Sequence, residues 1–131
     1  MAPSAEAVDG KLDGLEAALR VWRASKGSRV KRDAAEKELL RVVAGVRDML
    51  EAAASCSDRS ELKVVFGGDC ARMTRLRVLL APLQSEGGDV EERSRFLESC
   101  LRACGCLEKV LEDLGLGEAM RRARASSPGA E

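Results

Sequence analysis

The chain has 131 residues, enough for one domain, and 45% of them are hydrophobic, so it can bury a core and wholesale disorder is excluded. Its 22 Lys and Arg residues balance 22 Asp and Glu residues, so the formal net charge is zero. The chain therefore lacks the overall positive charge that is usual in nucleic-acid-binding proteins, although a local basic patch is still allowed. Histidine is absent, which removes the commonest general base and the commonest neutral metal ligand.

The first predicted helix covers residues 6–25 and follows a disordered stretch over residues 1–5. Its apolar residues recur at alternating gaps of four and three, as in the a/d seam of a coiled coil: Val8, Leu12, Leu15, Leu19 and Trp22. Gly27 and Ser28 then read as a short turn. A connection this short predicts that the next helix packs antiparallel to the first.

The second predicted helix begins near Arg29 and ends at Ser55-Cys56-Ser57-Asp58. Its apolar stripe is widened by adjacent pairs such as Val42 and Val43, which is typical of a helix in a bundle rather than in a two-stranded coil.

The third predicted helix starts at Asp58-Arg59-Ser60-Glu61, which has the Asp-x-x-Glu form of a capping box. Its apolar stripe reaches Leu83, but Gly67-Gly68 interrupts it and Pro82 lies near its end. We expect a helix that is kinked or broken at the glycines and ended or bent by Pro82. The alternative, a strand over Leu62–Phe66, is disfavoured because the sequence offers no partner strand.

The fourth predicted helix begins with the capping-box form Asp89-Val90-Glu91-Glu92 and ends at Leu114-Gly115-Leu116, where Gly115 would adopt a left-handed conformation. The sum is an all-α fold, an antiparallel up-down bundle of four helices with coiled-coil-like seams. One helical-bundle domain spans residues 6–116. Residues 117–131 would form a short helical turn and a disordered tail.

The five cysteines favour core packing over a specific chemistry. Cys100 and Cys104 share one helical face, whereas Cys106 points elsewhere, and a fourth zinc ligand would have to come from Cys70 or Cys56. Gly67-Gly68-Asp69 lacks the lysine of a phosphate-binding loop. We therefore predict no metal, no cofactor and no catalytic residue.

The N-terminus has neither the basic start nor the apolar run of a signal peptide, and no stretch approaches the roughly 20 apolar residues of a membrane span. We expect a cytoplasmic protein with reduced cysteines, and a nuclear location stays open.

The predicted helices carry apolar stripes that suit contacts with other helices, and the sequence shows no catalytic motif. We therefore predict a non-enzymatic protein–protein interaction module, such as an adaptor, a complex subunit or a co-chaperone-like factor. It would bind partner helices, or a second copy of itself, through leucine-rich seams. The candidate interface residues are Leu12, Leu15, Leu19, Trp22, Val43, Leu50, Leu80 and Val110.

The alternative is an anion-binding module acting on nucleic acid or on an acidic membrane surface. Six cations and no acid lie between residues 20 and 32: Arg20, Arg23, Lys26, Arg29, Lys31 and Arg32. Arginines also cluster at residues 72–77 and 121–124. Such clusters often pair with acids on a neighbouring helix, and the acidic fourth helix is the expected counterpart.

Overall fold

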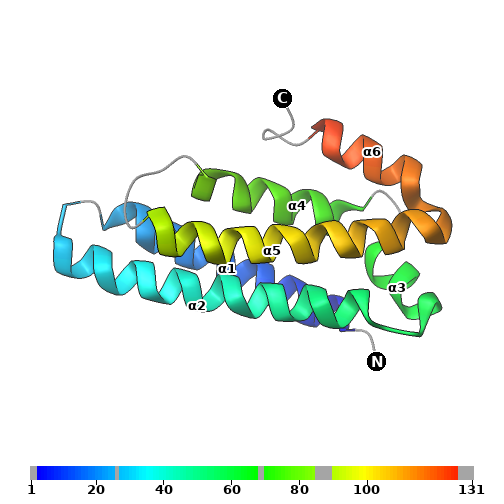
Figure 1. Ribbon diagram of the computed structural model, residues 1–131, viewed down its shortest axis with the longest axis horizontal. Coiled ribbons are helices and arrows are strands. Elements are labelled where there is room, and N and C mark those ends of the chain that lie inside the picture. Colours follow the sequence, from blue (N-terminus) through cyan, green and yellow to red (C-terminus); the bar gives the residue numbers. More distant parts are fainter. Residues whose placement is uncertain (1–2, 26, 68–69, 85–89, 127–131) are drawn as a thin grey trace.

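The computed structural model describes residues 3–25, 27–67, 70–84 and 90–126 (Figure 1). All regular structure within these ranges is helical, which confirms the all-α prediction. The α-helices are α1 (Ala5–Ala24), α2 (Arg29–Ala54), α3 (Arg59–Phe66), α4 (Ala71–Leu80), α5 (Val90–Leu111) and α6 (Gly117–Ser126). A 3₁₀ turn (Ala81–Gln84) follows α4, and a π turn (Glu112–Leu116) joins α5 to α6.

The four-helix count is not confirmed. The expected third helix consists of α3 and α4, and α6 is a helix of its own beyond α5. The helices α1, α2, α4 and α5 nevertheless alternate in direction, since each runs back along the molecule relative to the one before it (Figure 1). The most extensive packing joins α2 to α5 and α1 to α2, while α4 packs on α1 and on α6.

Side-chain caps place three of the helix starts. Ser4 accepts a hydrogen bond from the Ala7 amide, Ser28 from the Lys31 amide and Asp58 from the Glu61 amide. The predicted start at Asp58 and the turn before Arg29 are therefore confirmed. The predicted cap at Asp89 lies outside the described residues.

The chain leaves α3 at Gly67, a position that has no room for a side chain. A Cβ atom there would lie 2.2 Å from the carbonyl oxygen of Lys63. The helix resumes at Ala71, so the predicted break near Gly67-Gly68 is confirmed. Ahead of α4, Cys70 takes a left-handed conformation (φ 58°), which L-residues rarely adopt. The α-helical geometry then ends at Leu80, two residues before Pro82.

The reversal between α5 and α6 depends on Gly115, which has φ 89° and ψ 11° inside the π turn. The left-handed glycine predicted at this position is confirmed. The helix that follows is longer than the one or two turns expected, because it runs from Gly117 to Ser126. The disorder predicted for residues 1–5 and for residues 126–131 is wrong at Ala5, which begins α1, and at Ser126, which ends α6. Residues 1–2 and 127–131 lie outside the described part of the chain.

The apolar stripes of the helices close on one another and form a single core. The leucine seams expected to meet a partner are part of this core, so they are covered within one chain. The candidate interface residues that are buried are Leu12, Leu15, Leu19, Trp22, Val43, Leu50 and Leu80, and Val110 is partly buried against them. A repeat of apolar residues specifies a buried face, but it does not specify whether the covering helix belongs to the same molecule.

Candidate interaction surfaces

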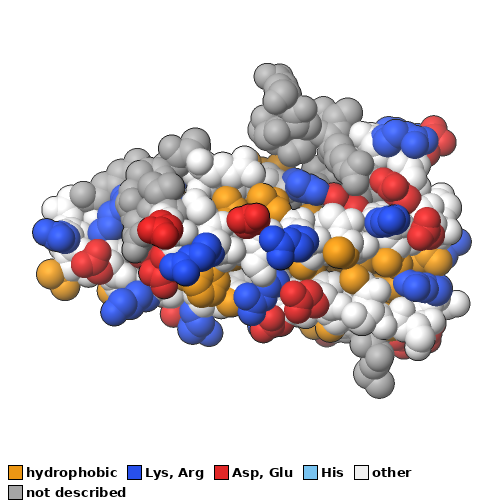
Figure 2. Space-filling view, viewed as in Figure 1, with side chains coloured by type: hydrophobic (Ala, Val, Ile, Leu, Met, Phe, Trp, Pro, Cys, Tyr) orange, Lys and Arg blue, Asp and Glu red, His pale blue; other side chains and the backbone are white. Residues whose placement is uncertain are grey.

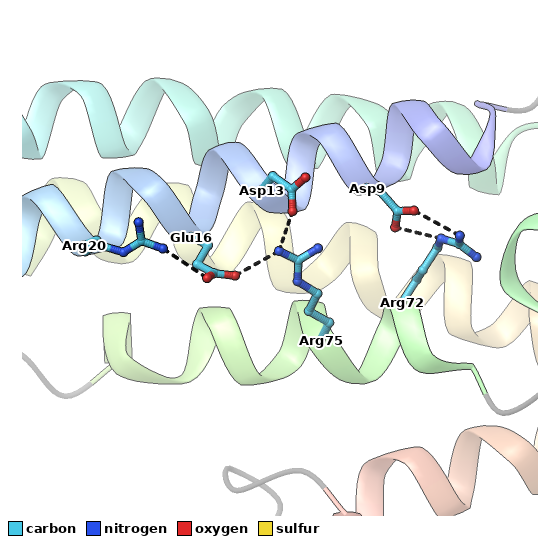
Figure 3. Close-up of polar contacts among 6 residues, drawn as sticks. All are labelled: Asp9, Asp13, Glu16, Arg20, Arg72 and Arg75. Atoms are coloured by element: carbon cyan, nitrogen blue, oxygen red, sulfur yellow. Dashed lines mark hydrogen bonds and ion pairs between the residues drawn. The ribbon is translucent and has the colours of Figure 1, made fainter.

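Ion pairs join α1 to α4 along their shared edge (Figure 3). The guanidinium of Arg72 binds both carboxylate oxygens of Asp9, at 2.9 Å and 3.1 Å, and also donates to the carbonyl oxygen of Val65 at 2.9 Å. The hydrogen bonds from Arg72 lower the pKa of Asp9 from its ordinary value, because they favour the ionised carboxylate. Arg72 thus fixes α4 to α1 and to the end of α3.

One turn along α4, Arg75 contacts two acids of α1. Its Nη2 atom lies 2.7 Å from Asp13 and 2.9 Å from Glu16. Glu16 also accepts a hydrogen bond from Arg20 at 3.2 Å, so one carboxylate serves two guanidinium groups (Figure 3). We call the set Asp9, Asp13, Glu16, Arg72 and Arg75 the α1–α4 ladder.

The arginines at residues 72–77 were expected to pair with the acidic fourth helix, but most of their ion pairs are with α1. Arg72 and Arg75 pair with acids of α1, and only Arg77 reaches the acidic α5 helix, where it binds Glu108 with Nε 3.1 Å from Oε2. The Glu108 side chain is only 2% exposed, whereas that of Arg77 is partly exposed, so the carboxylate of this ion pair is buried and the guanidinium reaches the surface. Spacing along α4 explains the split, since Arg77 lies on a different face from Arg72 and Arg75.

A second, buried group of charges lies where α1, α2 and α5 meet. The Arg93 side chain, 3% exposed, lies 3.3 Å from Glu36 and donates to the carbonyl oxygen of Leu83 at 3.3 Å. Two guanidinium groups lie over the Trp22 ring, with the Cζ atom of Arg32 4.9 Å and that of Arg93 5.2 Å from the ring centroid. The indole Nε1 and Glu36 Oε2 are buried and have no hydrogen-bond partner within the described structure.

An open groove of about 530 Å³ lies beside the ladder, between α1 and the end of α4. Its walls are mostly apolar, and one of them carries Val78, an unusually exposed large hydrophobic residue at 37%. The charged groups are Glu16, Arg20 and Arg23, all on α1. We call this surface the α1–α4 groove; its lining residues are Glu16, Leu19, Arg20, Arg23, Val78, Leu79, Ala81 and Pro82.

The predicted basic patch lies at the end of the molecule where α1 ends and α2 begins. Lys26 lies outside the described residues, and the remaining five cations form what we call the basic end: Arg20, Arg23, Arg29, Lys31 and Arg32. Arg32 is half-buried over Trp22, whereas the other four are exposed. Figure 2 shows Lys and Arg side chains beside hydrophobic surface at this end, which is on the left in that view.

The cysteines divide as predicted. Cys100 and Cys104 are buried in the core and Cys106 is exposed. Burial raises the pKa of the Cys100 thiol to about 11, against the opposing effect of Arg47 and Arg77. Cys106 lines a smaller groove of about 220 Å³ between the end of α2 and α5. Among the described residues no three Cys, Asp or Glu side chains are grouped so that they could hold a metal ion.

Comparison with protein-family models, with curated proteins and with solved structures found no match. Within the described part of the chain, none of the helices combines the length and the apolar character needed to cross a membrane.

Sequence reasoning missed the buried charges Glu36, Arg93 and Glu108, although the sequence carries a signal for each of them. Glu36 lies three residues before Leu39 and seven before Val43, on the apolar stripe of its helix. Glu108 follows Cys100 and Cys104 at intervals of four, and Arg93 fills the stripe position between Val90 and Leu97. A charged residue at a stripe position predicts a buried ion pair, because a lone buried charge is strongly disfavoured.

Proposed function

We propose that this protein is a non-enzymatic interaction module, an adaptor or complex subunit, that binds an acidic amphipathic helix of a partner protein in the α1–α4 groove. The observation that carries this proposal is the groove itself, which presents apolar side chains between two helices. Helix-in-groove recognition uses this arrangement, with apolar residues of the bound helix at intervals of three and four.

The groove keeps apolar side chains at the surface after the core has formed. Leu19 forms part of its base from α1, while Val78 and Leu79 contribute from α4. Burial of apolar area on binding would favour association by about 25 cal/mol for each Å² removed from water. A partner helix would cover Val78 without opening the bundle.

Charge along the rim argues for an acidic partner. Arg20 and Arg23 lie three residues apart on α1, so both face the same side of the groove. Glu16, the acid of the rim, is already bound by Arg75 and Arg20. The lining of the groove carries two arginines against one glutamate, and a Glu-rich flank on the bound helix complements this excess of positive charge.

The test uses synthetic helical peptides and fluorescence anisotropy. One peptide has a leucine stripe flanked by Glu, a second has the same stripe flanked by Lys, and a third keeps the Glu residues but replaces the leucines by Ser. We expect the Leu/Glu peptide to bind most tightly, and V78D to weaken its binding by about tenfold or more, since a charge would be buried against leucine. The matched control is V64D, because Val64 is 81% exposed on α3, outside the groove.

Three results would overturn the proposal. These are equal binding of the Lys-flanked peptide, equal effects of V78D and V64D, and a V78-dependent dimer in sedimentation equilibrium. The last result would make a second copy of this chain the occupant of the groove.

A further inference from the structure

The basic end combines positive charge with exposed apolar side chains. Val21 in the last turn of α1 is 60% exposed and Val30 in the first turn of α2 is 80% exposed. Arg29 and Lys31 flank Val30 and are exposed as well. No acid lies between residues 20 and 32, although Asp33 follows directly and Glu91 and Glu92 lie in the first turn of α5.

The backbone of α2 adds to this positive potential. A helix N-terminus carries a partial positive charge and normally attracts acids into its first turn. The first turn of α2 has no acid, and it contains Arg29, Lys31 and Arg32 instead. Arg32 packs over Trp22, whereas Arg29 and Lys31 are exposed, and an external anionic surface would relieve the repulsion between them and the helix N-terminus.

The exposed side chains distinguish between two kinds of anionic surface. Single-stranded nucleic acids are usually held by aromatic side chains that stack on bases. The aromatic residues of this chain are Trp22, Phe66 and Phe96, of which the first two are buried and the third is partly buried against the core. Aliphatic residues beside cations instead suit the boundary between lipid headgroups and acyl chains.

We propose that the basic end is a docking surface for anionic phospholipid bilayers. Arg23, Arg29 and Lys31 contact the headgroups, while Val21 and Val30 enter the interface between headgroups and acyl chains. Because α1 ends and α2 begins at the basic end, the long axis of the bundle would point away from the bilayer surface, and the opposite end of the bundle would stay in water (Figure 1). This surface is separate from the groove except for Arg20 and Arg23 on their shared rim.

The test is co-sedimentation of the full chain with vesicles of phosphatidylcholine alone and of phosphatidylcholine mixed with phosphatidylserine. We expect binding to the mixed vesicles only. R29Q/K31Q removes two cations and should weaken that binding by about 30-fold at physiological salt. The matched control is R59Q/K63Q, which removes the same charge from exposed positions on α3 at the other end of the molecule.

The apolar contribution has its own matched pair. Val30 and Val64 are equally exposed, at 80% and 81%, but only Val30 lies at the basic end. V30S should therefore weaken vesicle binding by about fivefold, and V64S should leave it unchanged. A short DNA duplex and a single-stranded RNA serve as competitors. Equal binding by R29Q/K31Q and R59Q/K63Q, indifference to V30S, or tighter association with either nucleic acid than with the mixed vesicles would overturn the proposal. Because the variants lie outside the groove, failure here leaves the helix-binding proposal standing.

Discussion

The α2–α5 edge and the α1–α4 edge are held together in different ways. The α2 and α5 helices pack along most of their length through buried side chains such as Val46, Leu50 and Leu107, and their ion pair, Glu36–Arg93, is buried. The α4 helix is short. It contributes Met73, Leu76 and Leu80 to the core, but its pairing with α1 also depends on the partly exposed α1–α4 ladder.

The difference teaches where the molecule is robust and where it responds to solution conditions. Buried apolar contacts contribute several kcal/mol per large side chain and barely respond to salt, whereas an exposed ion pair contributes about 0 to 1 kcal/mol and is screened. We therefore expect α4 to separate from the bundle more easily than α5. The α1–α4 groove lies on that weaker edge, where a bound helix would tie the two walls together.

The largest expected effect is at the buried ion pair. Arg93→Met leaves the Glu36 carboxylate buried without its cation, and we expect the free energy of unfolding to fall by about 4 kcal/mol. Urea denaturation measures the change. The double variant E36L/R93M should recover most of the loss, and an equal loss in both variants would assign it to the contact of Arg93 with Trp22 instead.

A cavity in the core should come next. Leu107 is fully buried on α5, and Leu107→Ala is expected to cost about 3 kcal/mol of unfolding free energy. Because the lost contacts are apolar, the cost should be the same in about 0.1 M and about 1 M NaCl. A cost that shrinks in high salt would contradict the contrast between the two edges.

The stability that the α1–α4 ladder contributes should depend on salt, unlike that contributed by Leu107. Arg75→Met removes both hydrogen-bonded contacts with Asp13 and Glu16, and we expect a loss of about 0.5 kcal/mol at low salt that becomes smaller in about 1 M NaCl. Arg41→Met, which removes an ion pair within α2, is the control. It should leave hydrogen exchange in α4 unchanged, whereas Arg75→Met should accelerate it.

Acid should weaken the same edge through Asp9. Its pKa is lowered in the folded chain by Arg72, so the ionised carboxylate stabilises the fold at pH values above the ordinary value of 3.8. That stabilisation is lost as the pH falls through the lower, folded pKa. The acid sensitivity of thermal unfolding should therefore be smaller in Asp9→Asn. Asp113→Asn, which removes an exposed carboxylate from the π turn, should retain the wild-type response.

The smallest effect on stability is expected at the exposed thiol. Cys106→Ala should change the free energy of unfolding by less than about 0.5 kcal/mol. It should nevertheless abolish the fast reaction of the native protein with a thiol reagent, because the other four cysteines are buried. Fast labelling that persists in Cys106→Ala would show that the core opens near Cys56, Cys70, Cys100 or Cys104.

Local structure was predictable because its determinants are local. Ser28 and Asp58 cap the helices that follow them, Gly67 follows the last residue of α3, and Gly115 takes the left-handed conformation inside the π turn. Each of these depends on a few neighbouring residues. The boundaries of α1 and α2 were therefore within one or two residues of the prediction.

The arrangement of the helices was less predictable because it depends on which faces meet. Periodicity identified Leu12, Leu50 and Leu80 as a buried face, yet it could not show that the same chain covers them. The counterparts of Arg72 and Arg75 likewise depend on α4 packing against α1. The groove depends on two segments about 60 residues apart, and the sequence pattern carries no signal for it.

The position of Trp22 means that the intrinsic tryptophan fluorescence of the protein reports on the basic end. It is the one tryptophan of the chain, and it is fully buried in contact with the guanidinium groups of Arg32 and Arg93. Intrinsic fluorescence excited at the indole therefore comes from the junction of α1, α2 and α5 alone. Any event that separates these helix ends admits water to the ring and shifts its emission to the red, without a dye or a label.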